Sequence, residues 1–232
     1  YLTDNAVASS CSFYPAHHLC TIEGGMVSSN IKSIIDIARS IAWWGRACYC
    51  KGSQNKLPNG ACGKRFDYWM DGIDTIVDHK YVFSQKGYNF KPADLQGAMG
   101  IVQLKKFDKI HAKRRENKQK IDGIFSKIPG CRVIKEHSSA EVSWFGVPLI
   151  YKGKHKLVNF LEKNKIQTRN YFAGNLLRHP AYKNLDIYGN NKFNNADRVL
   201  DEVFFLGCSP VIKENMIEYI DDKVNEFIKL HT

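Results

Sequence analysis

The segment SFYPAHH, residues 12–18, places a hydroxyl and an imidazole close together in the chain. Ser12 precedes His17 by five residues, and the pair Gly24-Gly25 follows. A serine hydroxyl can hold a phosphate, and an imidazole exchanges protons near neutral pH, so it can act as a general base. The same histidine also suits a structural role in which neighbours satisfy its ring nitrogens. These residues alone leave both interpretations open.

The flanking sequence predicts two strands around a turn, followed by a helix. Ser12-Phe13-Tyr14 has the composition of a strand start, and Gly24-Gly25 leads into the apolar pair Met26-Val27. From Ile31 to Trp44 the apolar residues recur at helical spacing, and Asn30 is the candidate N-cap.

The apolar residues of the stretch 45–80 show no sustained helical or strand periodicity, which predicts a loop. A loop this long inside a domain is usually functional or disordered. The chain has seven cysteines, an odd and unevenly spaced set that argues against a secreted disulfide framework. Cys48, Cys50 and Cys62 fall within fifteen residues, and this local density predicts a metal or cluster site. The other cysteines and two tryptophans are expected in the core, namely Cys11, Cys20, Cys131, Cys208, Trp43 and Trp44.

Lys and Arg exceed Asp and Glu by 34 − 23 = 11 residues, which favours anionic partners. The densest basic run, Lys105 to Lys120, lies in a stretch predicted to be helical from Pro92 to Ile128, with a bend near Phe107-Asp108. We expect a solvated helix face there and not a nucleic-acid site, because no recognition motif accompanies the charge.

The C-terminal part alternates strands and helices. Strands are expected over residues 132–135, 143–150, 166–171 and 203–206, and helices over 155–164 and 213–230, with a polar loop after residue 171. This order predicts an α/β or α+β subdomain. No run approaches the roughly 18 apolar residues of a membrane span, so we expect a cytoplasmic protein without a membrane partner. The first residue is Tyr1, so a piece of a longer protein is also expected.

Residues 12–25 resemble the active-site segment of the DegT/DnrJ/EryC1/StrS family of pyridoxal-phosphate sugar aminotransferases, with His17 at the position of the family's lysine. Residues 87–104, 143–146 and 168–176 are similar to further family segments, so the resemblance covers nearly the whole chain. It implies an α/β protein of the pyridoxal-phosphate-dependent transferase fold type I, as in aspartate aminotransferase. Residues 1–105 would form the C-terminal part of the large cofactor-binding domain, including the cysteine loop. Residues 106–232 would form the small C-terminal domain.

Histidine in place of lysine marks the branch of nucleotide-sugar 3-dehydratases, and the resemblance therefore implies a lyase. The cofactor would be pyridoxamine 5′-phosphate, the amine form of pyridoxal 5′-phosphate, and His17 would be the catalytic base. Ser12 would contact the cofactor phosphate, and Asn89 would reach the phosphate in the neighbouring subunit, which implies a homodimer.

Three residues match family positions near the substrate, namely Arg169, Asn175 and Arg178. The cations suit a nucleotide diphosphate, and a structural salt bridge is an equal alternative for either arginine. The substrate would be a nucleotide-linked 4-keto-6-deoxyhexose, on the way to dideoxysugars of bacterial surface polysaccharide such as the O-antigen of lipopolysaccharide.

The cysteine loop is most similar to that of the branch acting on CDP-4-keto-6-deoxyglucose. This similarity implies that Cys48, Cys50 and Cys62 ligate a 2Fe-2S cluster, although the gap from Cys50 to Cys62 is longer than in the branch pattern. An NADH-dependent iron-sulfur flavin reductase would supply electrons. The fourth cluster cysteine would lie upstream of Tyr1, so the isolated chain is expected to be inactive.

Two alternatives remain open. The first is a cluster-free 3-dehydratase acting on a GDP sugar, or a sugar aminotransferase homologue of the same fold. The second is an inactive fragment that only binds a partner or a nucleotide sugar. Iron and sulfide analysis separates the cluster-free enzyme from the cluster enzyme.

Overall fold

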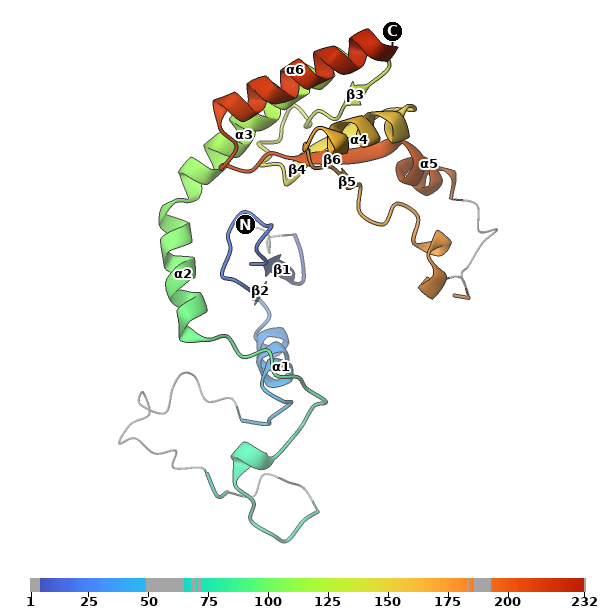
Figure 1. Cartoon of the computed structure of the whole chain (residues 1–232). Coiled ribbons are helices and arrows are strands. Elements are labelled where there is room, and N and C mark those ends of the chain that lie inside the picture. Colours follow the sequence, from blue (N-terminus) through green and yellow to red (C-terminus); the bar gives the residue numbers. More distant parts are fainter. Residues whose placement is uncertain are drawn as a thin grey trace. The chain divides into compact units, whose positions relative to one another are not determined.

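The structure is a computed structural model, and it describes residues 5–48, 65–67, 70, 72–182, 184–185 and 193–231. The chain divides into two compact units, unit 1 (Tyr1–Leu104) and unit 2 (Lys105–Thr232), which are described one after the other (Figure 1).

An antiparallel hairpin opens unit 1 and carries residues 13–24 in its loop. Strand β1 (Ser9–Ser12) pairs with strand β2 (Gly25–Ser28), and Ser12 lies opposite Gly25. The two predicted strands are confirmed, but the first one ends at Ser12, where the sequence had suggested that it begins. Beyond Ser12 the chain turns at Pro15, which has no N–H to give to a ladder.

Helix α1 (Lys32–Ala42) confirms the predicted helix but begins differently. Its N-cap is Ile31 and not Asn30, and the N–H of Ile31 is donated to Ser29 Oγ at 3.0 Å. The prediction that Trp43 lies in the core is wrong, since this side chain is 44% exposed. The helix ends there, and the next residue takes a left-handed φ of 62°, so the chain turns out of the helix.

The end of α1 pairs with residues 82–90 through main-chain hydrogen bonds. Trp44 N donates to Tyr88 O at 2.9 Å, and Phe90 N donates to Ala42 O at 3.0 Å. Two glycines make this approach possible: a Cβ on Gly45 would lie 1.8 Å from the Gln85 carbonyl oxygen, and one on Gly87 would lie 2.0 Å from Gly45 N. The pairing places residues 89–92 beside the end of α1.

Helix α2 (Asp94–Lys105) completes unit 1 after the 3₁₀ turn η3 (His79–Tyr81). The side chain of Gln96 joins the start of α2 to the hairpin loop: its Oε1 accepts from Ala93 N at 2.7 Å and its Nε2 donates to Glu23 O at 2.7 Å. The first bond is the reciprocal half of a capping box. Helix α3 begins at Phe107, so the predicted helical stretch is interrupted at Lys106, next to the predicted bend.

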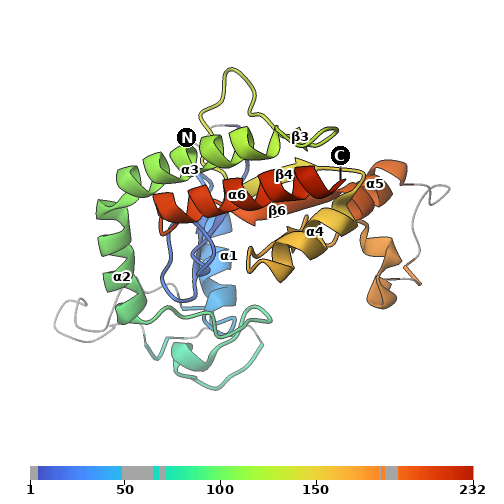
Figure 2. The same ribbon diagram turned by 45° about the horizontal axis from the view of Figure 1, so that its top comes forward.

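Unit 2 contains a four-stranded antiparallel sheet in the order β3-β4-β6-β5. Its strands are β3 (Arg132–Val133), β4 (Gly146–Ile150), β5 (Arg169–Asn170) and β6 (Val203–Gly207). Its helices are α3 (Phe107–Phe125), α4 (Lys154–Lys163), α5 (Asn194–Glu202) and α6 (Glu214–His231), with the 3₁₀ turns η4 (Leu176–Arg178) and η5 (Pro180–Tyr182). Antiparallel pairing makes this unit α+β, and α3 lies beside α6 (Figures 1 and 2). Helix α5 corrects the prediction of a polar loop.

The core of unit 2 forms where one face of the sheet meets the helices. Val147 and Leu149 of β4 and Phe204 and Leu206 of β6 are buried there. The helices contribute fully buried apolar side chains, namely Ile121, Phe125, Leu157, Leu161 and Val224. Cys208 belongs to this cluster, and Cys131 packs against it, as predicted for both thiols.

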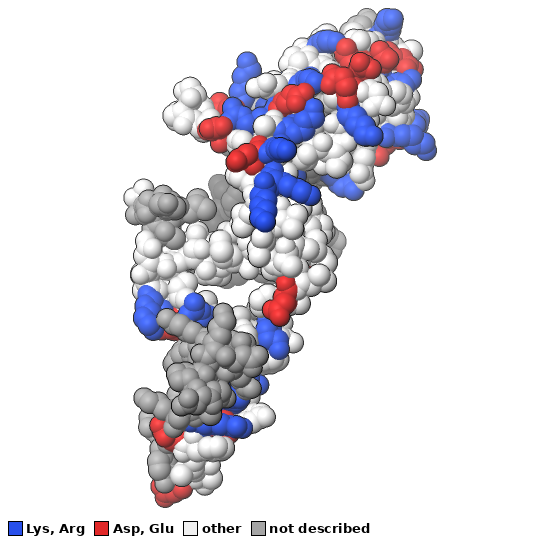
Figure 3. Space-filling view, turned by 90° about the vertical axis from the view of Figure 1, so that its left-hand side faces the viewer, with Lys and Arg blue, Asp and Glu red and all other residues white. Residues whose placement is uncertain are grey.

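Helix α3 is not the fully solvated basic face that the sequence suggests. Arg114 and Lys118 are 5% and 6% exposed. Arg114 donates to the carbonyl oxygens of Trp144 and Phe145, and Lys118 donates to Ile134 O at 3.0 Å and lies 4.9 Å from the Trp144 ring. The other Lys and Arg side chains of unit 2 are interspersed with Asp and Glu on the face shown in Figure 3. No helix in the described part of the chain is both long and apolar enough to cross a membrane.

Candidate functional site

His17 lies in the hairpin loop, and its main chain forms a local turn. His17 N donates to Tyr14 O at 2.9 Å, and the two rings meet edge to face with centroids 5.8 Å apart. The histidine side chain is half-buried, so solvent and a ligand can reach part of it.

Several contacts fix the two ends of this loop. Phe13 N donates to Gly24 O at 2.9 Å, and Thr21 N donates to Phe13 O at 3.0 Å. The Thr21 hydroxyl donates to Glu23 O at 2.6 Å, the same carbonyl that receives the Gln96 amide. Gly24 adopts a φ of 137°, where a Cβ would lie 2.9 Å from the Thr21 hydroxyl oxygen. The loop that carries His17 is therefore held at its base by bonds between its two ends and by Gln96 of α2.

Ser12 lines an open pocket of about 1010 Å³ within unit 1. Its lining includes two serines, two cationic residues and one acidic residue, namely Ser10, Ser12, Arg39, Lys91 and Glu23. The Ser12 side chain is exposed, and its Oγ accepts from Tyr14 N at 3.3 Å, so its own proton remains available for donation. Hydroxyl and cationic donors in one pocket suit an anionic group such as a phosphate.

Asn89 is exposed beside this pocket without lining it. Its main chain forms an isolated bridge with Trp43, whereas its neighbours Phe90 and Lys91 do line the pocket. Lys91 Nζ lies 5.6 Å from the Trp43 ring and 5.2 Å from the Trp44 ring, and Arg46 lies 4.8 Å above the latter. Cation–π contacts of this kind hold Lys91, which lines the pocket, beside the two rings.

Asn175 and Arg178, in unit 2, meet on one carboxylate that the sequence analysis missed. Asp197 Oδ1 accepts from Asn175 Nδ2 at 2.7 Å, and Arg178 forms a two-pronged pair with Asp197 at 2.9 and 2.7 Å. The Arg178 guanidinium, assisted by the Asn175 amide, lowers the pKa of Asp197 to about 2. Asn175 is buried and Arg178 is exposed. The structure thus contains the salt bridge that was the alternative for Arg178.

Arg169 is exposed on β5, and its Nη1 donates to Thr168 O at 3.1 Å. Cys48 is half-buried and is not in a disulfide, whereas Cys50 and Cys62 lie outside the described residues. The described residues contain no group of three or more His, Cys, Asp or Glu side chains that could hold a metal ion. Cys11 is exposed, which contradicts its predicted place in the core, because it lies on a two-stranded hairpin with open faces.

The sequence profile of the DegT/DnrJ/EryC1/StrS aminotransferase family matches residues 3–225. This chain belongs to that family.

Two relatives with similar sequences are named for work on sugars or polysaccharides. The dTDP-4-dehydro-2,6-dideoxy-D-glucose 3-dehydratase of Saccharopolyspora spinosa is 36% identical over 225 residues, which are 95% of this chain and 48% of the relative. The lipopolysaccharide biosynthesis protein RfbH of Salmonella typhimurium is 34% identical over 227 residues, 95% of this chain and 51% of the relative. The chain therefore spans about half the length of these relatives.

Solved structures of the family confirm the predicted fold class. The E. coli GDP-4-keto-6-deoxy-D-mannose-3-dehydratase with bound hydrated PLP has a TM-score of 0.72 at 25% identity, covering 96% of this chain and 57% of that one. A family aminotransferase from Brucella abortus has a TM-score of 0.73 at 16% identity, covers 96% of this chain and 51% of that one, and supports the fold alone. The chain has the α/β fold of these pyridoxal-phosphate-dependent enzymes.

Within this fold, the predicted site residues fall into two groups. Ser12, His17 and Asn89 belong to unit 1, and the substrate candidates belong to unit 2. Ser12 lines the open pocket, and His17 and Asn89 do not. The cations Arg39 and Lys91 were missed because they stand alone in the sequence, without a motif that links them to Ser12.

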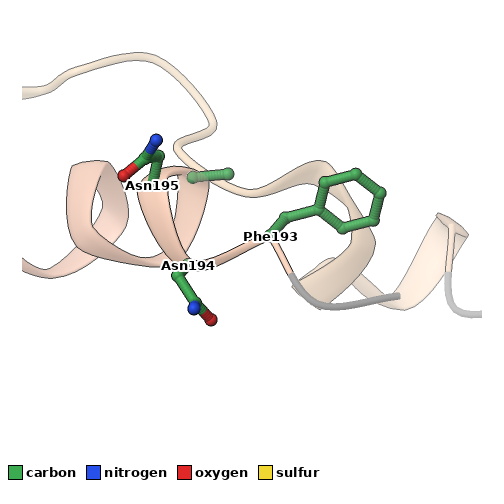
Figure 4. A pocket seen from close by; sticks show the side chains of 4 residues that line it. Phe193, Asn194 and Asn195 are labelled. Atoms are coloured by element: carbon green, nitrogen blue, oxygen red, sulfur yellow. The ribbon is translucent and has the colours of Figure 1, made fainter. Parts of the chain in front are cut away.

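A second hollow, of about 560 Å³, lies at the start of α5. Its described lining is Phe193, Asn194, Asn195 and Ala196, and Figure 4 shows the two amide side chains and the phenyl ring around it. None of these four side chains is titratable, so the hollow offers no acid–base chemistry from them.

Proposed function

We propose that this chain contributes the catalytic base of a nucleotide-sugar 3-dehydratase that uses pyridoxamine 5′-phosphate. The reaction removes the C3 hydroxyl of a nucleotide-linked 4-keto-6-deoxyhexose. The proposal rests on His17, an imidazole that the resemblance of residues 12–25 places at the family's lysine position, on a loop that Gln96 and Thr21 hold at its base. Three relatives are named as 3-dehydratases, and these names support the same reaction.

The residues around Ser12 fit a phosphate-bearing cofactor. The exposed Ser12 hydroxyl has a proton to donate, and Arg39 and Lys91 add positive charge to the same pocket. Ser12 would hold the cofactor phosphate, and the exposed amide of Asn89 would serve a second subunit in a homodimer. When bound, pyridoxamine phosphate supplies a free amine for the sugar's 4-keto group and an electron sink for loss of the hydroxyl. A fully active monomer in light scattering contradicts the role of Asn89.

His17 acts as the general base in this proposal. One imidazole nitrogen accepts a proton, and the ring is oriented by the turn at Tyr14. An imidazole has no primary amine, so it does not take over the covalent role of a lysine. The base is therefore retained while the covalent link of an aminotransferase is lost.

The nucleotide is proposed to be cytidine diphosphate, because the cysteine loop is most similar to that of the CDP-sugar branch. Arg169 would meet the diphosphate, and Asp197 would orient Asn175 and Arg178. The relatives are named for dTDP and GDP sugars, so the comparison of all three nucleotides is part of the test.

Cys48, Cys50 and Cys62 would supply thiolate ligands to a 2Fe-2S cluster, which would pass electrons from a separate NADH-dependent reductase. Iron and sulfide analysis of the anaerobically purified protein, with Cys62→Ser for comparison, tests this assignment. Iron that stays bound in Cys62→Ser contradicts it.

The function is tested with the protein encoded by the complete reading frame that contains this chain. Incubation with pyridoxamine phosphate and each 4-keto-6-deoxy nucleotide sugar should give the C3-deoxygenated product, identified by mass spectrometry. His17→Asn should bind cofactor and substrate but lose about 10²–10⁴-fold in rate, because an amide cannot accept the proton. A wild-type protein that only transfers an amino group contradicts the proposal.

A further inference from the structure

One face of the unit 2 sheet carries aromatic rings. Side chains alternate along a strand, and residues directly opposite on antiparallel strands share a face. Phe204 and Leu206 point into the core, so Phe205 points to the other face, together with its partners Pro148 and Arg169.

Four rings gather on this face. The Phe205 ring lies close over Gly146, where a Cβ would be only 2.4 Å from Phe205 Cδ2. The rings of Phe145 and Phe172 each lie 5.8 Å from that of Phe205 and 6.1 Å from one another, and Tyr171 lies 5.5 Å from Phe172. Phe172 is packed against these rings on one side and is still 67% exposed.

The main chain holds Phe172 in an unusual conformation. Its φ is 50°, in the left-handed region that a bulky side chain rarely adopts. Phe172 N donates to Asn170 O at 2.7 Å, and Gly174 N donates to Tyr171 O at 3.2 Å, so two hydrogen bonds fix the turn. Strain of this kind persists only where the surroundings impose it, and it is common at ligand sites. Here it accompanies a large apolar ring that faces solvent.

Positive charge accompanies the rings. Arg169 shares the face of Phe205, is exposed, and forms no ion pair with another described residue. Asn175 and Arg178 follow on the same segment and are held by Asp197. Arg169 Nη1 donates to Thr168 O, but no described carboxylate pairs with the guanidinium, so its charge is not neutralised. An apolar ring surface beside this charge matches the two halves of a nucleotide, a planar base and its phosphates.

We propose that Phe172 is the stacking surface for the nucleobase of a bound nucleoside diphosphate, with Arg169 meeting the phosphates. This inference rests on the proposed function and deepens it, since it assigns the nucleotide end of the substrate to the segment 169–178. Stacking accepts every base, so Phe172 supplies affinity without selecting among cytosine, thymine and guanine.

The test uses the complete protein and isothermal titration calorimetry with CDP, dTDP, GDP and inorganic pyrophosphate. Phe172→Leu should weaken the binding of each nucleotide about tenfold, within the range of base–aromatic stacking, and leave pyrophosphate unchanged. Phe172→Trp should bind nucleotides as well as the wild type. Phe172→Asn should lose the same affinity without a lower melting temperature, since asparagine tolerates a left-handed backbone. Tyr219→Leu, on helix α6, is the control and should bind normally.

The inference is overturned by wild-type affinity for nucleotides in Phe172→Leu, by equal weakening of nucleotides and pyrophosphate, or by the absence of nucleotide binding to the wild type. A Phe172→Asn protein that melts at a lower temperature with normal affinity also overturns it, and indicates a ring that packs against polypeptide. The proposed function fails independently, if the wild type binds nucleotides through Phe172 yet catalyses amino transfer without dehydration.

Discussion

In the proposed mechanism, the side chain at position 17 selects between dehydration and amino transfer, according to whether it carries a primary amine. We expect His17→Lys in the complete protein to form a covalent bond with pyridoxal phosphate that borohydride traps, because a primary amine reacts with the cofactor aldehyde and an imidazole does not. Mass spectrometry and an absorbance band report the bond, and C3 dehydration should fall in favour of amino transfer. Normal dehydration without a trappable bond means that residue 17 is not at the lysine position.

The cysteines should differ in reactivity according to their burial. Burial raises the pKa of the Cys131 thiol to about 11 and also raises the pKa of Cys208, so little thiolate exists at either at pH 8. Cys11 is exposed on β1. Iodoacetamide followed by peptide mass spectrometry should modify Cys11 in the folded chain, and the other two only after denaturation. Rapid labelling of Cys208 in the native chain contradicts the packing described for it.

At the residue scale, the sequence identifies candidate functional side chains better than it identifies the groups with which they form hydrogen bonds and ion pairs. Type and spacing single out Ser12 and His17 as candidates, and their roles stay predictions from the family resemblance. Arg114 and Lys118 were misjudged, because what buries them is a set of main-chain carbonyls from residues 134, 144 and 145, which no side-chain pattern reveals. Asp197 was missed for a similar reason, since its two partners lie 22 and 19 residues away in the chain.

Asp197 of α5 pairs with Arg178 of η4, and the contribution of this ion pair to the stability of the fold should depend on pH. Its pKa in the folded chain is lowered from 3.8 to about 2, so its stabilising contribution is present above the unfolded value and is lost as pH falls toward 2. Asp197→Asn should therefore lower the melting temperature slightly at pH 7, because exposed ion pairs contribute little, and the difference should vanish near pH 2. Thermal melts followed by circular dichroism measure it. A difference that grows on acidification contradicts the pairing.

At the element scale, most helices and strands follow from periodicity, and their ends do not. Helix α1 was predicted from Ile31 to Trp44 and spans Lys32–Ala42. Ile31 N donates to the Ser29 hydroxyl, so the turn before the helix, and not Asn30, provides this bond. Helix α5 was missed since its short sequence, NNADRVLDE, holds few apolar residues. Its three apolar residues, Ala196, Val199 and Leu200, lie at helical spacing on one face, and the helix packs with β6.

At the scale of the whole chain, the sequence indicated two parts but not how unequally they are packed. In the described residues, unit 1 has a single buried hydrophobic side chain, Val82, whereas unit 2 holds the entire remaining core. Composition cannot reveal this difference, because apolar residues such as Leu95, Ile101 and Leu104 occur in unit 1 and remain exposed there. Burial depends on which surfaces meet, and that is a property of the fold.

The unequal packing predicts that matched leucine substitutions in the two units differ in cost. Leu161 of α4 is 0% exposed, and Leu104 of α2 is 62% exposed. We expect Leu161→Ala to lower the free energy of unfolding of this chain by about 2–5 kcal/mol, because it removes buried methyl groups and leaves a cavity. Leu104→Ala should change it by no more than about 0.5 kcal/mol. Urea denaturation followed by circular dichroism gives both values. If both variants lose the same free energy of unfolding, Leu104 is buried against an apolar surface, which contradicts the exposure described for it.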